Sequence, residues 1–156
     1  SMVAEMHPEK VKILVYVCAF LLAEGQSIAD VVAAGEESLV KRNMVSLDGG
    51  RSLVIRDEAL REGLFGDCSD ADFEWARSRL VPEPAEPRTT PVTVTSERFG
   101  SVPRVYVECL RDNAVPLSAQ REMYNAWPCE RVFAMDTSHS PFISAPRELA
   151  AHLLAV

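Results

Sequence analysis

The sequence predicts an α/β fold in which about three parallel strands with flanking helices carry a long inserted cap. Three runs rich in β-branched and aromatic residues predict the strands, at residues 12–20, 104–110 and 131–135. Nearly unbroken apolar runs of this kind are typical of parallel strands that are covered on both faces. Helical segments follow the second and third runs, and this alternation is the pattern of parallel βαβ units.

The elements outside the insertion follow from local signals. Residues 3–9 predict the last turns of a helix, closed at His7-Pro8, because a residue before proline is pushed out of the helical region. The first strand follows at once. Residues 118–126 have helical composition, and residues 147–154 predict a closing amphipathic helix with Pro146 in its first turn.

The excursion between the first two strands, residues 21–101, is too long for a simple crossover. It predicts helices over residues 27–41 and 69–79, the second with Ser69 as its N-cap. We therefore divide the chain into a core segment 1–22, an inserted cap 23–100 and a second core segment 101–156.

Turn residues divide the rest of the cap. Gly49-Gly50 separates two short apolar runs, residues 44–47 and 52–55, and this spacing predicts a small hairpin. A proline-rich linker at residues 82–87 precedes a return that is rich in β-forming residues.

Composition narrows the classes of partner. The net charge of −7 and the isoelectric point near 5.0 disfavour binding to a phosphate backbone, so we expect no nucleic-acid partner. The longest apolar stretch without a charge, Ile13–Ala23, is too short to cross a bilayer. We expect no membrane partner and a cytoplasmic location.

The cysteines do not predict a metal site. Cys18, Cys68, Cys109 and Cys129 form no C-x-x-C pair, and no histidine lies near them at the spacing of zinc ligands. Cys18 and Cys109 fall inside apolar strand runs, where we expect them to act as small buried hydrophobic residues.

Two residues of the second core segment predict acid–base chemistry. Asp112 lies in a turn directly after a predicted strand, and His139 follows the next strand 27 residues later. An imidazole can move a proton in both directions near neutral pH, and a carboxylate can fix its tautomer. The pair therefore suggests the acid and base of a hydrolase, whereas an ordinary turn cap and a structural histidine are the alternatives.

The cap also offers candidates for substrate binding. Four apolar side chains fit the wall of a pocket for an acyl or alcohol group, although packing inside the cap is the alternative for each: Leu64, Phe65, Phe73 and Trp75.

Several segments, in order, resemble the α/β-hydrolase superfamily, and in particular its branch of methylesterases, salicylate-binding esterases and hydroxynitrile lyases. They are VYVCAFL at Val15–Leu21, LREGLFGDC at Leu60–Cys68, ERFGSVPRVY at Glu97–Tyr106, DNAVP at Asp112–Pro116 and PRELA at Pro146–Ala150. The resemblance covers the chain from Glu5 onward. It implies the C-terminal part of an α/β-hydrolase sheet with an inserted cap.

The resemblance also implies roles. Asp112 matches the triad acid and His139 the general base of the family, and triad chemistry needs neither a cofactor nor a metal. The family's nucleophilic serine lies on a Gly-x-Ser-x-Gly turn before the helix that ends near His7-Pro8, and that pattern is absent from the chain. The parent protein is then a serine hydrolase, a carboxylesterase for a small apolar ester, to which this chain supplies the acid and base but not the serine.

The sequence leaves two alternatives to an esterase open. Ser140 stands directly after His139, where the hydroxynitrile lyases have a lysine, and this favours ester hydrolysis over a lyase activity. The other alternative is a non-catalytic half-domain that acts as a binding or self-associating module. An unpaired sheet edge would promote a homodimer or oligomer, and the chain alone is expected to be inactive.

Overall fold

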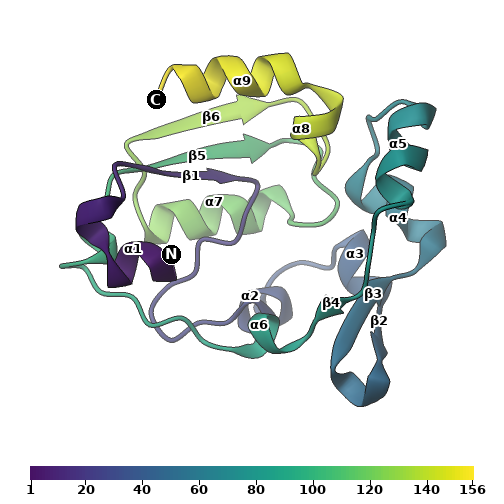
Figure 1. Cartoon of the computed structure of the whole chain (residues 1–156), viewed down its shortest axis with the longest axis horizontal. Coiled ribbons are helices and arrows are strands. Elements are labelled where there is room, and N and C mark those ends of the chain that lie inside the picture. The colour runs from purple at the N-terminus through teal and green to yellow at the C-terminus, as the bar shows by residue number, and fades with distance from the viewer.

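Three parallel strands form the centre of the computed structural model, which describes residues 1–156. They are β1 (Leu14–Val17), β5 (Arg104–Cys109) and β6 (Arg131–Met135), in the order β1-β5-β6. Tyr16 is paired with Tyr106, and Val107 with Phe133. All six residues of β5 are buried, as expected for the middle strand of a covered sheet. The predicted parallel strands are therefore confirmed (Figure 1).

Helices cover both faces of this sheet. Helix α7 (Leu117–Ala126) lies on one face and α9 (Pro146–Leu154) on the other (Figure 1). Because side chains alternate along a strand, Tyr16 and Tyr106 pack in the cluster that contains Met123 of α7, whereas Val107 packs against Leu149 of α9. The core thus has one apolar layer on each side of β5.

The N-terminal helix is short and is tied to the segment that returns from the cap. Helix α1 (Met2–Met6) ends before His7-Pro8, as predicted, and a 3₁₀ turn, η1 (Pro8–Lys10), follows. Glu5 accepts hydrogen bonds from the amides of Thr95 and Phe99, at 2.8 and 3.0 Å. The predicted β-rich return forms no strand, because carboxylates such as that of Glu5 take the backbone hydrogen bonds that a neighbouring strand would receive.

Strand β1 is shorter than the predicted strand over residues 12–20. Cys18 has a φ of 39°, in the left-handed region that non-glycine residues rarely adopt. Its amide still donates to the oxygen of Val107 at 2.9 Å, but the chain then turns out of the sheet. The pairing therefore ends at Val17, where the cap begins to diverge from the core.

The predicted helix over residues 27–41 is wrong in being continuous. The structure has two helices instead, α2 (Ile28–Ala34) and α3 (Leu39–Arg42). Gly35 ends the first in an extended conformation, and Ser38 caps the second by accepting from the amide of Lys41. A glycine that ends one helix, followed three residues later by a serine that caps the next, favours a break over one long helix.

The predicted hairpin is confirmed. Strands β2 (Met44–Leu47) and β3 (Ser52–Ile55) are antiparallel and are joined by η2 (Asp48–Gly50). Gly49 and Gly50 have φ values of 67° and 95°, which glycine adopts without steric cost. The predicted linker also contributes a short third strand, β4 (Glu83–Pro84), paired with β3.

Two helices complete the wall of the cap. Helix α4 (Asp57–Leu64) was not predicted, whereas α5 (Asp70–Arg77) was, with Ser69 as its N-cap. Their apolar faces meet in a small buried cluster: Leu60, Phe65, Cys68, Phe73 and Ala76. Two short turns of helix, α6 (Glu86–Thr89) and η3 (Phe99–Ser101), lead back to the sheet.

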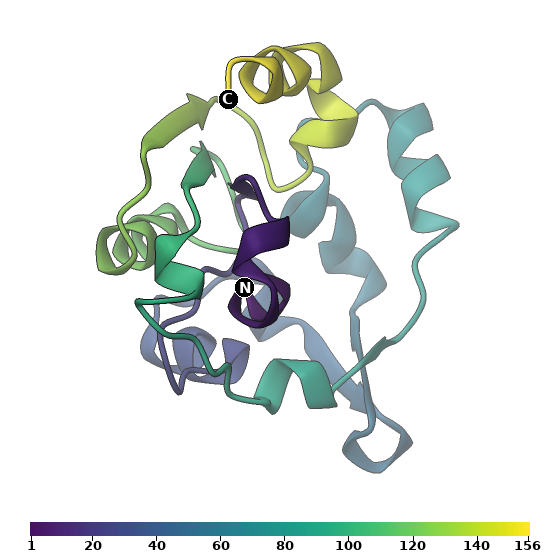
Figure 2. The ribbon, with the colours of Figure 1, turned by 60° about the vertical axis from the view of Figure 1, so that its left-hand side comes forward.

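The hairpin and α5, blue to teal, lie to one side of the parallel sheet (Figure 2). The antiparallel sheet is separate from the parallel one, and both its main strands fall between β1 and β5 in the sequence. The division at residues 22/23 and 100/101 stays a prediction. None of the helices combines the length and hydropathy that a membrane span requires.

An ion pair between the half-exposed Arg121 and a buried carboxylate links α7 to β5 and gives the first testable prediction. Arg121 donates to both carboxylate oxygens of the buried Glu108, at 3.1 and 3.0 Å. Hydrogen bonds from Arg121, opposed by burial, hold the pKa of Glu108 below its usual value. Arg121→Ala should lower the free energy of unfolding by about 1–2 kcal/mol at pH 7, because it leaves the buried carboxylate without this partner. The loss should be no larger, because half of the arginine side chain is exposed to solvent.

The pH dependence of this effect has a defined sign. Because the folded pKa of Glu108 is depressed, the pair's contribution is present above the unfolded carboxyl pKa of about 4.3 and is lost as the pH falls through the lower, folded value. Denaturant unfolding at pH 7 and below pH 4 checks this. An equal loss at both pH values, or the same loss in the exposed variant Arg147→Ala, would contradict it.

Candidate active site

The turn after β5 holds Asp112 in a fixed orientation. One carboxylate oxygen, Oδ1, accepts the amides of Ala114 and Val115, at 2.7 and 2.9 Å. The Asp112 side chain is 0% exposed. This local turn is the capping role that the sequence left open for an aspartate at this position, and it leaves the other oxygen, Oδ2, available for a different partner.

A buried glutamine supports that turn. Gln120 of α7 is 0% exposed, and its amide nitrogen donates to the oxygen of Val115 at 2.8 Å and to Asp112 Oδ2 at 3.3 Å. Its side-chain oxygen accepts the amide of Cys109 at 3.1 Å. Gln120 therefore links the end of β5 to Asp112 and to the rest of its turn, residues 112–116, which we call the acid turn.

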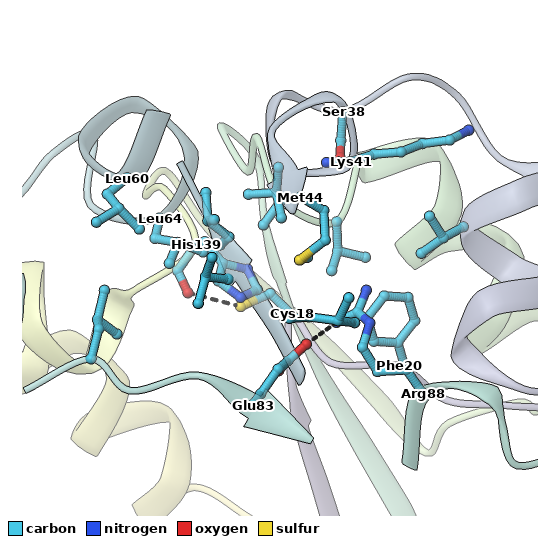
Figure 3. A pocket seen from close by; sticks show the side chains of 18 of the residues that line it. Cys18, Phe20, Ser38, Lys41, Met44, Leu60, Leu64, Glu83, Arg88 and His139 are labelled. Carbon is cyan, nitrogen blue, oxygen red and sulfur yellow. Dashed lines mark hydrogen bonds and ion pairs between the residues drawn. The ribbon is translucent and has the colours of Figure 1, made fainter. Parts of the chain in front are cut away.

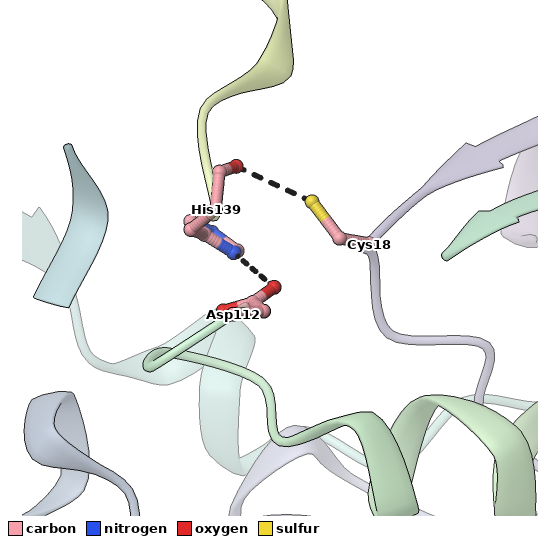
Figure 4. A group of neighbouring side chains, drawn as sticks. All are labelled: Cys18, Asp112 and His139. Atoms are coloured by element: carbon pink, nitrogen blue, oxygen red, sulfur yellow. Dashed lines mark hydrogen bonds and ion pairs between the residues drawn. The ribbon is translucent and has the colours of Figure 1, made fainter. Parts of the chain in front are cut away.

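The loop after β6 brings His139 to Asp112. The distance from His139 Nδ1 to Asp112 Oδ2 is 2.8 Å (Figure 4). The carboxylate already accepts two backbone amides, so it is the acceptor here and Nδ1 carries the proton. The Nε2 lone pair of His139 is then free to take a proton, which is the state that a general base requires.

The thiol of Cys18 lies beside this pair. Its sulfur donates to the backbone oxygen of His139 at 3.3 Å (Figure 4). A hydrogen bond with Cys109 and burial both raise the pKa of Cys18, so this thiol is protonated at neutral pH. Cys18 was predicted to be core packing; it is buried, but it also contacts the histidine loop.

Cys18, Asp112 and His139 are also the group whose atoms could hold a metal ion. One ligand atom from each lies within 4.8 Å of the others. However, both oxygens of Asp112 already accept hydrogen bonds. A metal ion would have to replace these hydrogen bonds and also the proton of the Cys18 thiol. The arrangement fits a hydrogen-bonded acid–base pair better than a ligand set.

A cavity of about 650 Å³ lies above the pair, between the core and the cap. His139 and Cys18 line it from the core, and Leu60, Leu64 and Met44 line it from the cap (Figure 3). Its lining residues are mostly hydrophobic. An apolar cavity that opens onto one histidine can hold a small apolar molecule beside the Nε2 atom.

The charged side chains that line this cavity are paired with one another or with neighbours. Arg88 donates to Glu83 at 3.0 Å, and Lys41 lies 3.1 Å from Glu37. Arg77 donates to both carboxylate oxygens of Asp57, from Nε and from Nη2. The cavity therefore presents no unpaired cation to an anionic ligand.

The four predicted substrate-binding residues occupy different places. Leu64 lines the cavity, whereas Phe65 and Phe73 lie in the buried cluster between α4 and α5. Trp75 is exposed, with the Arg79 guanidinium 4.4 Å from its ring centre. Their substrate role stays a prediction, for which Leu64 has the most suitable position.

Sequence reasoning assigned no role to two polar residues that reach the site. Gln120 was visible as a polar residue on the buried face of α7, and this is a signal that could have found it. Asp67 bonds to Ser138, the neighbour of His139, across 71 residues of sequence, and no local pattern indicates such a contact.

Comparisons with known proteins show which family the chain belongs to. The profile of the family described as alpha/beta hydrolase matches residues 1–152. Methylesterase 7 of Arabidopsis thaliana is 31% identical over 169 residues, covering 100% of this chain and 64% of that protein. The pyrethroid hydrolase of Sphingobium wenxiniae is 32% identical over 158 residues, covering 96% of this chain and 56% of that protein.

A solved structure has a similar fold over nearly the whole of this chain. The crystal structure of a pyrethroid hydrolase from Sphingobium faniae JZ-2 superposes with a TM-score of 0.82 at 28% identity, covering 99% of this chain and 64% of that one. The chain thus spans 64% of this structure, and between 37% and 64% of the curated relatives that it matches. From its sequence profile and its fold, this chain belongs to the alpha/beta hydrolase family.

Proposed function

We propose that this chain supplies the acid and base of a serine carboxylesterase that acts on a small, neutral, largely apolar ester. The observation that carries the proposal is the 2.8 Å contact between the buried Asp112 and Nδ1 of His139, a residue that lines an apolar cavity. The nucleophilic serine and the oxyanion-hole donors belong to residues outside this chain.

The acid–base roles follow from the geometry. In the proposed reaction, His139 Nε2 takes the proton of the serine hydroxyl as that oxygen attacks the ester carbonyl. The imidazolium then gives this proton to the leaving alcohol, and a water molecule hydrolyses the acyl-enzyme by the same route. Asp112 stays ionised and stabilises the imidazolium through the Nδ1–H bond.

The cavity wall supports the choice of a neutral substrate. Contact between its apolar side chains and the acyl or alcohol carbons of a substrate would favour binding by about 25 cal/mol per Å² of apolar surface buried. Its cations are already paired, as Arg88 is with Glu83. A substrate carboxylate would therefore lose its hydration without a compensating partner.

A substrate comparison tests this proposal on the whole polypeptide that the gene encodes. We expect hydrolysis of a p-nitrophenyl ester of a short aliphatic acid, and a lower kcat/KM for an analogue whose acyl chain ends in a carboxylate. Glu83→Gln should release Arg88 to pair with the substrate carboxylate and so raise kcat/KM for the anionic analogue. The increase should be only about two- to fivefold, because ion pairs near the surface are weak. The variant should leave the neutral ester unchanged.

The matched control is Glu74→Gln. Glu74 does not line the cavity, and its partner Arg77, 3.4 Å away, keeps its two bonds to Asp57 in this variant. It should change neither substrate. Absence of hydrolysis of any ester by folded protein would reject the esterase proposal, and a preference for the anionic ester would reject the neutral substrate.

The sheet edges favour the second candidate, a self-associating half-domain. β1 and β6 form the two opposite edges of the parallel sheet, and Val132 on β6 is exposed. Unpaired edges are templates for pairing with another chain. Light scattering decides this for the chain, because a monomer has a mass of 17.2 kDa.

A further inference from the structure

A carboxylate from the cap holds the backbone directly before His139. Asp67 lies in the turn between α4 and α5, and its carboxylate accepts the amide of Ser138 at 2.9 Å and the Ser138 hydroxyl as well. The Asp67 side chain is only 12% exposed, and Ser138 is buried. These two donors therefore have Asp67, and not solvent, as their partner.

The position of this contact along the histidine loop is specific. Backbone pairing between the acid turn and the histidine loop continues past β5 and β6 as far as the bond from Arg111 N to the oxygen of Thr137, at 3.0 Å. Ser138 is the next residue, so Asp67 provides the hydrogen bonds at the point where the backbone pairing ends. The histidine follows immediately.

Asp67 also approaches the residue directly before Asp112. Arg111 Nη2 lies 3.6 Å from Asp67 Oδ2, and Arg111 Nε donates to Asp136 at 2.8 Å. One carboxylate of the cap thus contacts the immediate neighbours of both members of the acid–base pair.

The charge of Asp67 is maintained in this place. Burial alone would raise the pKa of its carboxyl, but hydrogen bonds, first those from the hydroxyl and amide of Ser138 and then one from Ser144, outweigh burial and lower the pKa. Charge-assisted hydrogen bonds of this kind are shorter and stronger than neutral ones.

We propose that Asp67 is a positioning residue that fixes the His139 ring against Asp112 by holding Ser138 from the cap. This inference rests on the proposed function for its catalytic consequence, but the positioning itself can be measured without activity. Asp67 does not line the cavity, so it acts through the histidine loop and not through the substrate.

The consequence of losing Asp67 follows from the hydrogen-bond count. Alanine at this position would leave the Ser138 amide and hydroxyl buried without a partner, and the loop would have to move to satisfy them. A movement of about 1 Å at a catalytic base can lower the rate about 10²-fold.

The test uses the whole polypeptide that the gene encodes, labelled with ¹⁵N at histidine. The hydrogen-bonded Nδ1–H of His139 should give a downfield proton NMR signal that Asp112→Ala abolishes. Asp67→Ala should broaden or remove this signal and lower kcat about tenfold to hundredfold, with KM changed less than twofold. Asp67→Asn keeps an oxygen acceptor for Ser138 and should retain the signal and most of kcat.

Two control variants separate positioning from general destabilisation. Asp136→Ala removes the other carboxylate partner of Arg111, and Asp72→Ala removes an acid–serine pair elsewhere in the cap. Both should retain the Nδ1–H signal and kcat. If Asp67→Ala does not fold, Ser138→Ala, which removes only the hydroxyl bond, should give a smaller loss in the same direction.

The outcomes distinguish the two claims. An unchanged Nδ1–H signal in folded Asp67→Ala, or an equal loss in Asp72→Ala, would overturn the positioning role whatever the activity. A wild-type protein that shows the signal, loses it in Asp67→Ala and hydrolyses no ester would confirm the positioning and reject the proposed function alone.

Discussion

Asp112→Asn is expected to lower kcat for ester hydrolysis by about 10⁴-fold in the whole gene product, while the protein stays folded. An asparagine oxygen can still accept the amides of Ala114 and Val115, so the turn is preserved. Its amide group donates to Nδ1 of His139 where the carboxylate accepted. The ring then carries its proton on Nε2 and cannot take the proton of a serine.

The measurement is steady-state hydrolysis of a neutral p-nitrophenyl ester, with circular dichroism to verify the fold. Asp136→Asn is the matched control, because its carboxylate lies in the neighbouring loop, is 77% exposed and does not contact His139. It should keep nearly full activity. A loss of less than tenfold in Asp112→Asn would show that Asp112 is only a turn cap.

Gln120→Leu is expected to lower the free energy of unfolding by about 3 kcal/mol, the largest stability effect that we predict. Leucine has a similar size, but it cannot bond to the amide of Cys109 or the oxygen of Val115. Those backbone groups would stay buried and unsatisfied, because Gln120 is 0% exposed. Chemical denaturation of the wild type and the variant measures this loss.

Gln26→Leu provides the control for this prediction. Gln26 also accepts a backbone amide, that of Ala23 at 3.0 Å, but it is exposed and water can replace it. We expect a change within about 0.5 kcal/mol there. Similar losses for both glutamines would contradict the special position of Gln120.

The parallel strands could be predicted because their apolar runs are a local signal. Strand β5 reads as continuously apolar apart from Arg104 and Glu108, and both of these are buried with partners. The end of β1 could not be predicted. It depends on the left-handed turn at Cys18, which is set by the need to leave the sheet while keeping the bond to Val107.

The cap was less accessible to sequence reasoning. Helix α4 has charged residues through most of its length, and the few apolar residues of its buried face, such as Leu60, were noticed only as part of a family-like segment. The continuous helix over residues 27–41 failed at Gly35, which favours the end of a helix. Short cap helices are stabilised by tertiary packing more than by propensity, so local signals alone specify them poorly.

The candidate site shows the same division. Asp112 and His139 were found from their order along the chain after two strands, and the structure brings them to 2.8 Å. Asp67 was not found, because its role depends on a contact between the cap and the histidine loop. Such a contact forms only when the folded chain brings the cap turn with Asp67 to the sheet edge where the histidine loop lies.

Labelling with a fluorophosphonate probe, followed by peptide mass spectrometry, tests the central claim most directly. We expect the whole gene product to be labelled on a serine outside residues 1–156, and His139→Ala to abolish the label whereas His7→Ala keeps it. The folded chain of 156 residues alone should stay unlabelled. An adduct on a serine within residues 1–156, or labelling that persists in His139→Ala, would contradict it.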